Sequence, residues 1–214
     1  MSIITAVGDI HGCLSALTEL MKHIEDKYNL SEIQMIFLGD YIDRGESSRG
    51  VLDFLIEFQK NHKNSEFVLG NHEYMLINDE PYGIKSGESV LTEYVDGKIT
   101  IAHLSFLKDL KPYIESNSFV FTHGGIPYGF SNVSDVPVDG LVWEYGVWKG
   151  YSGKPVVCGH SARSEVRQSN NSICIDTGCY NPLYGKLTAA VLNDNSGELI
   201  ETISVQNKIY GGRA

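Results

Sequence analysis

Residues 39–45, which read GDYIDRG, decide the fold. They follow a mostly apolar run at 33–38 and bring two aspartates and an arginine directly behind Gly39. A buried strand that ends in glycine and charged side chains is typical of the carboxyl edge of an open α/β sheet, where such sheets bind ligands. Carboxylates suit metal ions, and arginine suits anionic groups. We therefore take Asp40 as the centre of the expected site.

The same order, an apolar strand followed by glycine and a metal-ligating side chain, recurs along the chain. GDIHG at 8–12 follows the run 3–7, GNHE at 70–73 follows 67–69, HGG at 123–125 follows 119–122, and GH at 159–160 follows 155–158. Carboxylate and amide oxygens suit hard divalent ions, and imidazole extends the choice to manganese, iron and zinc. The candidate ligands are Asp9, His11, Asp40, Asn71, His123 and His160.

In this order, the motifs GDIHG, GDYIDRG, GNHE, HGG and GH resemble the signature of the PPP-type metallophosphoesterases. That family includes the serine/threonine protein phosphatases, small phage and bacterial protein phosphatases, and the symmetrical diadenosine tetraphosphate hydrolases. The resemblance covers roughly residues 3–192. It implies the calcineurin-like metallophosphoesterase fold, which is a four-layer αββα sandwich of the α/β class.

The resemblance also implies a centre of two divalent metal ions, with manganese expected and iron or zinc as alternatives. One ion would be held by Asp9, His11 and Asp40, and the other by Asp40, Asn71, His123 and His160. Asp40 would then bridge the pair. Two ions about 4 Å apart can generate a hydroxide between them and clamp the phosphoryl group for in-line attack. Such a mechanism needs no phosphoenzyme.

Further side chains receive roles from the resemblance. His72 is the expected general acid, and Asp43 is expected to orient its imidazole. Arg44 is expected to bind the phosphate through its planar guanidinium. The family's additional phosphate-binding arginine is missing from LVWEYGVWKG at 141–150, which leaves Lys149 or Arg163 as its substitute. Arg163 is therefore included among the substrate-binding residues.

Apolar periodicity predicts the elements of the first half. Helical stripes at 14–24 and 51–58, the second capped by Ser47 or Ser48, alternate with strands at 3–7, 34–38 and 66–69. This order predicts a βαβαβ unit with parallel strands. A short helix follows GNHE, residues 78–97 are expected to form a mobile loop, and residues 101–110 recover a helical stripe.

The second half is predicted to be rich in strands. Residues 126–153 contain many glycines, prolines and aromatic residues with little regular pattern, and the segment from 155 onward is predicted to be all strand, with a hairpin turn at 195–197. An α/β half followed by a β-rich half predicts two sheets face to face with helices outside. We expect one catalytic domain over residues 1–214.

Composition limits the partners. The net charge of −10 and the lack of a basic run argue against binding to nucleic acid. No signal peptide precedes the first strand and no apolar run approaches membrane-spanning length, so a cytoplasmic protein with no membrane contact is expected. The four cysteines form no CxxC pair, which favours reduced, structural thiols.

Other phosphatase chemistries lack their motifs, because no cysteine has arginine six residues later and no GxSxG or GxxxxGK[ST] sequence occurs. The motif loops offer only Arg44 as a cation, so we expect a metal-dependent phosphoprotein phosphatase acting on phosphoserine, phosphothreonine or phosphotyrosine in proteins and peptides. The alternatives are a diadenosine polyphosphate hydrolase and a catalytically silent binding module. Leu69 favours the dinucleotide hydrolases and some small bacterial members, since many protein phosphatases of the family have arginine before GNHE.

Overall fold

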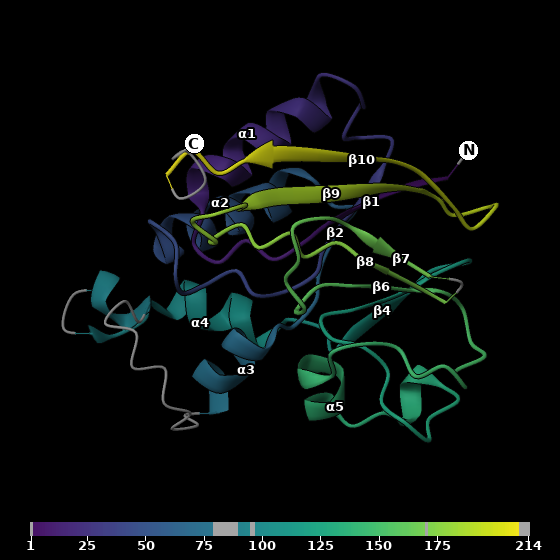
Figure 1. Ribbon diagram of the computed structural model, residues 1–214. Coiled ribbons are helices and arrows are strands. Elements are labelled where there is room, and N and C mark those ends of the chain that lie inside the picture. Colours follow the sequence, from purple (N-terminus) through teal and green to yellow (C-terminus); the bar gives the residue numbers. More distant parts are fainter. Residues whose placement is uncertain (1, 79–89, 95–96, 170, 210–214) are drawn as a thin grey trace.

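In the computed structural model, two five-stranded sheets face each other across a shared core (Figure 1). The structure describes residues 2–78, 90–94, 97–169 and 171–209. Helices cover the outer face of the first sheet, and a thinner layer of loops and short helices covers the outer face of the second. The α/β sandwich expected from the sequence is confirmed, although its fourth layer is only partly helical.

The first sheet combines the βαβαβ unit with the end of the chain. Its strands, in spatial order, are β10 (Glu198–Gln206), β9 (Lys186–Asn193), β1 (Ile3–Val7), β2 (Gln34–Phe37) and β3 (Ser65–Phe67). β1, β2 and β3 are parallel, as predicted, whereas β9 is antiparallel to both of its neighbours, β1 and β10. The C-terminal hairpin thus belongs to the α/β half. β9 is buried over nearly its whole length, which a central strand requires.

The second sheet contains short strands. In spatial order they are β4 (Tyr113–Glu115), β5 (Val120–Thr122), β6 (Val156–Cys158), β8 (Ser172–Cys174) and β7 (Arg167–Gln168). β5, β6 and β8 are parallel, so their carboxyl ends reach one edge of the sheet. The sequence did not predict β4 or β7, because two or three residues are too few to show an alternating pattern.

The helices are α1 (Leu14–Glu25), α2 (Ser48–Asn61), α3 (Asn71–Asn78), α4 (Ile101–Lys108) and α5 (Val138–Trp143), with the 3₁₀ helices η1 (Val90–Glu93) and η3 (Val133–Asp135). Ser47 caps α2, as predicted, by accepting a hydrogen bond from the Gly50 N–H. Two predictions need correction. The expected loop at 78–97 contains η1, with residues 79–89 and 95–96 outside the described part, and the irregular segment 126–153 contains α5 and η3.

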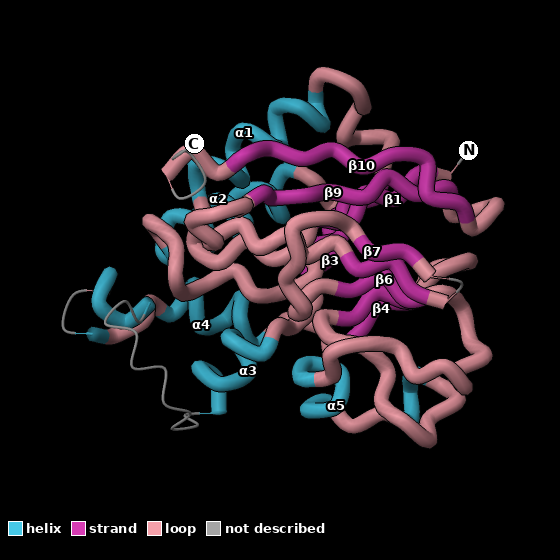
Figure 2. Tube along the Cα trace, viewed as in Figure 1, coloured by secondary structure: helices cyan, strands magenta, loops and turns pink. Residues whose placement is uncertain are grey.

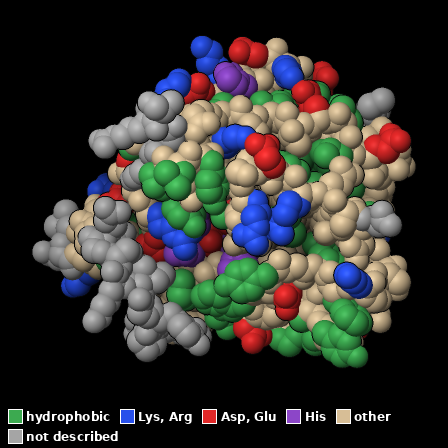
Figure 3. Space-filling model, viewed as in Figure 1, with side chains coloured by type: hydrophobic (Ala, Val, Ile, Leu, Met, Phe, Trp, Pro, Cys, Tyr) green, Lys and Arg blue, Asp and Glu red, His purple; other side chains and the backbone are tan. Residues whose placement is uncertain are grey.

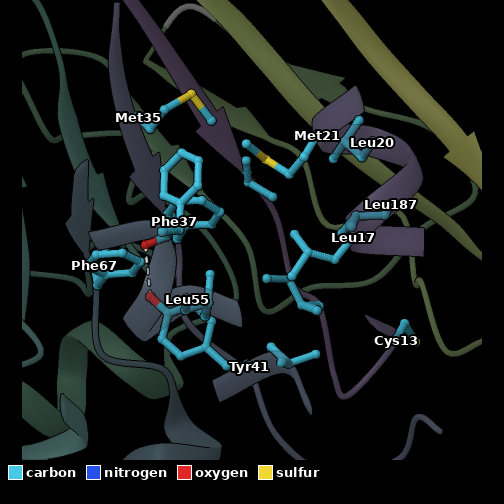
Figure 4. Close-up of a cluster of buried hydrophobic side chains, with 14 of the residues drawn as sticks. Cys13, Leu17, Leu20, Met21, Met35, Phe37, Tyr41, Leu55, Phe67 and Leu187 are labelled. Atoms are coloured by element: carbon cyan, nitrogen blue, oxygen red, sulfur yellow. Dashed lines mark hydrogen bonds between the residues drawn. The ribbon is translucent and has the colours of Figure 1, made fainter. Parts of the chain in front are cut away.

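Alternating side chains divide the core into layers. Along β1, Ile4 and Ala6 face the second sheet, while Val7 faces the helices. Figure 4 shows the helix-side cluster, in which the Tyr41 hydroxyl donates to the Phe37 carbonyl at 3.0 Å. Burying a large apolar side chain contributes about 1.5–3 kcal/mol, so this packing holds the strand ends that carry the site.

Figure 2 shows the strands of the two sheets as two neighbouring groups, with loops at both ends of the strands. All four cysteines are free and buried, as the sequence predicted. Within the described residues, no helix combines the length and apolar character that crossing a membrane requires.

Candidate metal centre

Asp40 lies between two imidazoles at the carboxyl edge of the sheets. Its Oδ2 atom is 3.2 Å from His11 Nε2, and its Oδ1 atom is 3.3 Å from His123 Nε2. All three residues are buried. A carboxylate that turns one oxygen toward each of two ligand groups has the geometry that a bridging ligand needs, which supports the central position expected for Asp40.

Hydrogen bonds to the backbone fix how these two rings face Asp40. His11 Nδ1 lies 3.0 Å from the Ile42 carbonyl, and His123 Nδ1 lies 2.9 Å from the Leu38 carbonyl. A carbonyl oxygen can only accept, so each Nδ1 carries a proton and each Nε2 of a neutral ring directs a lone pair toward Asp40. Lone pairs and a carboxylate at this separation repel one another unless a cation lies among them. The donor set therefore fits a divalent ion.

The electrostatics favour positive charge on one side of Asp40. Burial is the largest single influence on the pKa of His123 and lowers it, but Asp40, Asp9 and the Leu38 carbonyl together outweigh burial and raise that pKa to about 10. At His11 burial is the larger effect, and it lowers the pKa to about 4 in spite of Asp40. The site without metal thus attracts a proton to His123, at a position where a metal ion would supply the charge instead.

Asn71 and His160 complete a group around His123. Asn71 Oδ1 is 2.9 Å from His123 Nε2 and 3.0 Å from His160 Nδ1. Asp40, His123 and His160 also bring their ligand atoms within 4.8 Å of one another. The second ring nitrogen of His160 is buried and has no hydrogen-bond partner. Four of the ligands predicted from the sequence therefore converge here.

Asp9 differs from the other predicted ligands. Its carboxylate accepts the His160 N–H, with the two oxygens at 3.0 and 3.2 Å. Burial, and then Asp176, raise its pKa well above the usual range. It does not join His11 and Asp40 in one compact group, whose third member is His72. Asp9 stays a predicted ligand at the same edge, held beside the second group of ligands.

His72 and Asp43 form a hydrogen-bonded pair. His72 Nδ1 lies 2.7 Å from Asp43 Oδ2, and its Nε2 lies 3.9 Å from Asp40 Oδ2. Burial would lower the pKa of His72, but the Asp40 carboxylate and the hydrogen bond to Asp43 outweigh it and raise this pKa. The imidazole is thus oriented with Nδ1 on the carboxylate and Nε2 toward the ligands, which is the arrangement expected of a general acid.

Arg44 extends over the same edge. Its Nη1 atom is 3.0 Å from His11 Nε2, and its guanidinium carbon lies 4.2 Å from the centre of the Tyr180 ring. Such stacking on an aromatic face holds the plane of the guanidinium. Tyr180 was not singled out from the sequence, because it lies two residues beyond the IDTG segment and belongs to no motif.

Backbone strain is concentrated in the site. Among the described residues, five non-glycine residues have φ in the left-handed region, and all are predicted site residues: His11, Asp40, Asp43, Arg44 and His160. Each such conformation costs about 1–3 kcal/mol and persists only where neighbouring contacts enforce it. The rest of the fold must therefore offset this strain, which orients the five side chains toward the site.

Glu73 supplies part of the enforcement. Its carboxylate accepts the N–H groups of Asp40, Tyr41, Ile42 and Gly70 at 2.8–3.2 Å. Glu73 thus holds the backbone on both sides of the Asp40 ligand. Gly70 is required beside it, because a Cβ there would overlap Asp40 N and Oδ1.

A cleft of about 600 Å³ opens above the ligands. Three arginines line it, Arg44, Arg163 and Arg167, together with the aromatic residues Trp143, Tyr145, Tyr180 and Tyr184. Figure 3 shows basic side chains around the hollow, histidine below them, and hydrophobic side chains above and beneath. Of the two candidate substitutes for the missing arginine, Arg163 lines the cleft, whereas Lys149 is not among its lining residues.

Arg167 is the cation that sequence reasoning missed. It begins the two-residue strand β7 and donates through Nη2 to the Ser161 carbonyl and to Cys174 Sγ, at 2.9 and 3.2 Å. The sequence carries no signal for it, since β7 reaches the cleft only by pairing with β8.

Metal-binding donors beside a cleft rich in arginine give this site the chemistry of a metal-dependent phosphoester hydrolase. The model of the calcineurin-like phosphoesterase family matches residues 3–199. The chain belongs to this family.

Two similar proteins of known name are both bis(5'-nucleosyl)-tetraphosphatases, one symmetrical and one asymmetrical. The symmetrical bis(5'-nucleosyl)-tetraphosphatase of Marinomonas sp. (strain MWYL1) is 34% identical over 125 residues, which are 56% of this chain and 43% of that protein. The asymmetrical bis(5'-nucleosyl)-tetraphosphatase PrpE of Oceanobacillus iheyensis is 28% identical over 227 residues, 87% of each chain. The chain spans less than half of the first relative and most of the second.

A solved structure of a cold-active protein-tyrosine phosphatase from a psychrophilic Shewanella species has a TM-score of 0.72 and 18% identity, and covers 96% of this chain and 81% of its own. This likeness confirms the fold.

Proposed function

We propose that this chain hydrolyses dinucleoside polyphosphates. The observation that carries the proposal is the cleft, in which Arg163 and Arg167 join Arg44 beside the ligands. The expectation of a phosphoprotein substrate rested on a shortage of cations in the motif loops. The cleft contains Arg163, which was already a candidate, and adds Arg167. A polyphosphate chain needs several charge-assisted hydrogen bonds, while the aromatic rings of the cleft offer faces for a base. The names of the two tetraphosphatase relatives support the same substrate class.

The residues divide the work as follows. Divalent ions held by the predicted ligands would activate water and neutralise phosphate charge. Arg44, fixed by Tyr180, binds the oxygens of the phosphate under attack, and Arg163 and Arg167 hold phosphates farther along the chain. His72 carries a proton on the side of the ligands and gives it to the departing oxygen, while Asp43 holds the opposite ring nitrogen.

One observation favours a second function, the hydrolysis of phosphomonoesters in proteins or peptides. A departing nucleotide phosphate is a good leaving group and gains little from protonation, whereas an alkoxide or phenolate from a side chain gains much. The His72–Asp43 pair, with its 2.7 Å hydrogen bond, is suited to the poorer leaving group. Phosphoserine and phosphotyrosine peptides are therefore the substrates to compare.

The test measures kcat/KM for diadenosine tetraphosphate, a phosphoserine peptide, a phosphotyrosine peptide and p-nitrophenyl phosphate with one manganese concentration. We expect the dinucleotide to be preferred. A clear preference for a phosphopeptide would replace the first function by the second.

A matched pair of variants tests the cleft directly. Arg167→Gln should raise KM for diadenosine tetraphosphate by about 10-fold or more, since a charged hydrogen bond contributes about 1.5–3 kcal/mol. Its effect on p-nitrophenyl phosphate should be small, because this substrate has one phosphate. Lys149→Gln makes the same charge change at an exposed residue outside the cleft lining and should change neither. Equal effects of the two variants on the dinucleotide would contradict the assignment of Arg167.

A further inference from the structure

Asp43 is a strained residue that several contacts hold in place. Its φ is 68° and that of Arg44 is 74°, so two consecutive side chains occupy the left-handed region. Besides its bond to His72, Asp43 accepts the Val90 N–H on Oδ1 at 3.2 Å and donates its own N–H to Ser48 Oγ at 2.9 Å. Because strain relaxes when such contacts are lost, the orientation of His72 depends on Val90 and Ser48.

Glu93 joins these two contacts. Its Oε1 accepts the Ser48 N–H at 2.7 Å, and its Oε2 accepts the Arg49 N–H at 3.0 Å and the Ser47 hydroxyl at 3.2 Å. The first turn of α2 contains no acidic residue of its own. A carboxylate from another segment therefore satisfies the open N–H groups and complements the positive end of the helix dipole.

The residues next to Glu93 fasten the same segment. Val90 is 2% exposed, and the Tyr94 hydroxyl lies 2.7 Å from His103 Nδ1. His103 Nε2 in turn lies 2.8 Å from Asp53, which is on α2. Residues 90–94 are thus held against α2 through Glu93, through the Arg49 guanidinium over the Tyr94 ring, and indirectly through His103, and the contact through Glu93 is the one that leads to Asp43.

We infer that Glu93 is a positioning residue for the proton-donating pair His72–Asp43. Because Glu93 accepts hydrogen bonds from the first N–H groups of α2, it fixes Ser48 at the Asp43 backbone. It also fixes Val90, three residues before it, beside the Asp43 carboxylate. The Val90 N–H donates a hydrogen bond to Asp43 Oδ1, which leaves Oδ2 facing His72 Nδ1. This role rests on the proposed phosphoester hydrolysis and on the transfer of a proton to the leaving group, so it matters most for a phosphomonoester, whose leaving group gains much from protonation.

The experiment compares leaving groups in manganese-loaded protein. Glu93→Ala should lower kcat for phenyl phosphate by roughly 10- to 100-fold, because small misplacements of catalytic groups have effects of that size. The kcat for p-nitrophenyl phosphate, whose leaving group needs little protonation, should fall far less. A merely structural role would lower both rates together, so the ratio of the two rates is the readout.

Asp53→Ala is the matched control. It removes a carboxylate from the same helix and breaks the bond to His103, but it leaves Asp43 with its partners, so the ratio should not change. In an Asp43→Asn background, Glu93→Ala should leave the ratio unchanged as well, since residues that act as a unit are not additive. If Glu93→Ala does not fold, Glu93→Gln, which retains one acceptor oxygen, should shift the ratio in the same direction by less. Equal losses on both substrates, or the same shift in Asp53→Ala, would overturn the inference.

Discussion

The two edges of the cleft are built differently. The first sheet contributes loops that hold Asp40, Asp43 and Asn71 at 2–7% exposure. In these loops, backbone N–H groups donate hydrogen bonds to the carboxylates of Glu73 and Asp43. Beyond His123, the second sheet contributes Arg163 and Tyr145, and Tyr145 is 69% exposed. The contrast separates two tasks, since chemistry requires fixed atoms whereas substrate selection tolerates side chains that adapt.

The largest effect is expected at Asp40, the most buried of the three first-edge residues Asp40, Asp43 and Asn71. Asp40→Asn should abolish bound metal and lower activity by about 10³-fold or more, since removing even one fixed electrostatic contact from a catalytic site costs about 10²–10³-fold. Metal content per chain and activity are measured on the same sample. His23→Asn, at an exposed position on α1, is the control and should keep both. Retention of two ions per chain in Asp40→Asn would remove the bridging role.

A smaller and more selective effect is expected at the pair next to Asp40. His72→Asn should cost about 10²-fold or more on a phosphoserine peptide, which is the usual contribution of a general acid. The loss on p-nitrophenyl phosphate should be much smaller. Rates on both substrates decide the matter, and equal losses would show that His72 orients Asn71 or the phosphate instead of donating a proton.

One glycine on each edge of the cleft tests how tightly that edge is packed. Gly70→Ala places a Cβ against Asp40 and Glu73 and should weaken metal affinity about 10- to 100-fold, as changes beside metal ligands do. Gly146→Ala, in the layer over the second sheet, meets nothing within 4 Å and should be neutral. Metal titration and thermal unfolding of both variants test this. Equal tolerance at the two positions would mean that the first edge is less rigid than its contacts indicate.

The same contrast explains what the sequence could predict. The strand ends, α1, α2 and the convergence of Asp40, Asn71, His123 and His160 followed from periodicity and from ligands placed behind strands. Arg167, α5 and the strands β4 and β7 did not, because they depend on pairing between distant segments and have no local pattern. The position of the C-terminal hairpin in the first sheet is likewise a matter of tertiary pairing.

The expected substrate class rested on an incomplete count of cations for a related reason. Counting cations in the motif loops found Arg44 alone, since the number of charges near a metal site depends on which strands lie side by side. Arg167 reaches the cleft through its position on an edge strand. In this chain the candidate metal ligands lie in motifs that the sequence displays, whereas Arg167 lies on a short edge strand with no motif of its own.

The smallest effect is expected at the adaptable edge itself. The Tyr145 ring lies 4.7 Å from the His160 ring and is exposed to the cleft, so it offers a face on which a nucleobase can stack. Tyr145→Ala should raise KM for diadenosine tetraphosphate about fivefold, the low end for a base stacked on an aromatic side chain, and should leave p-nitrophenyl phosphate unaffected. Tyr128→Ala is the matched control, because Tyr128 is 75% exposed, packs against Trp148 and is not among the lining residues. No change of KM in the Tyr145 variant would place the base elsewhere in the cleft, for example at Tyr180 or Tyr184. A change of KM in the Tyr128 variant would place the base outside the cleft.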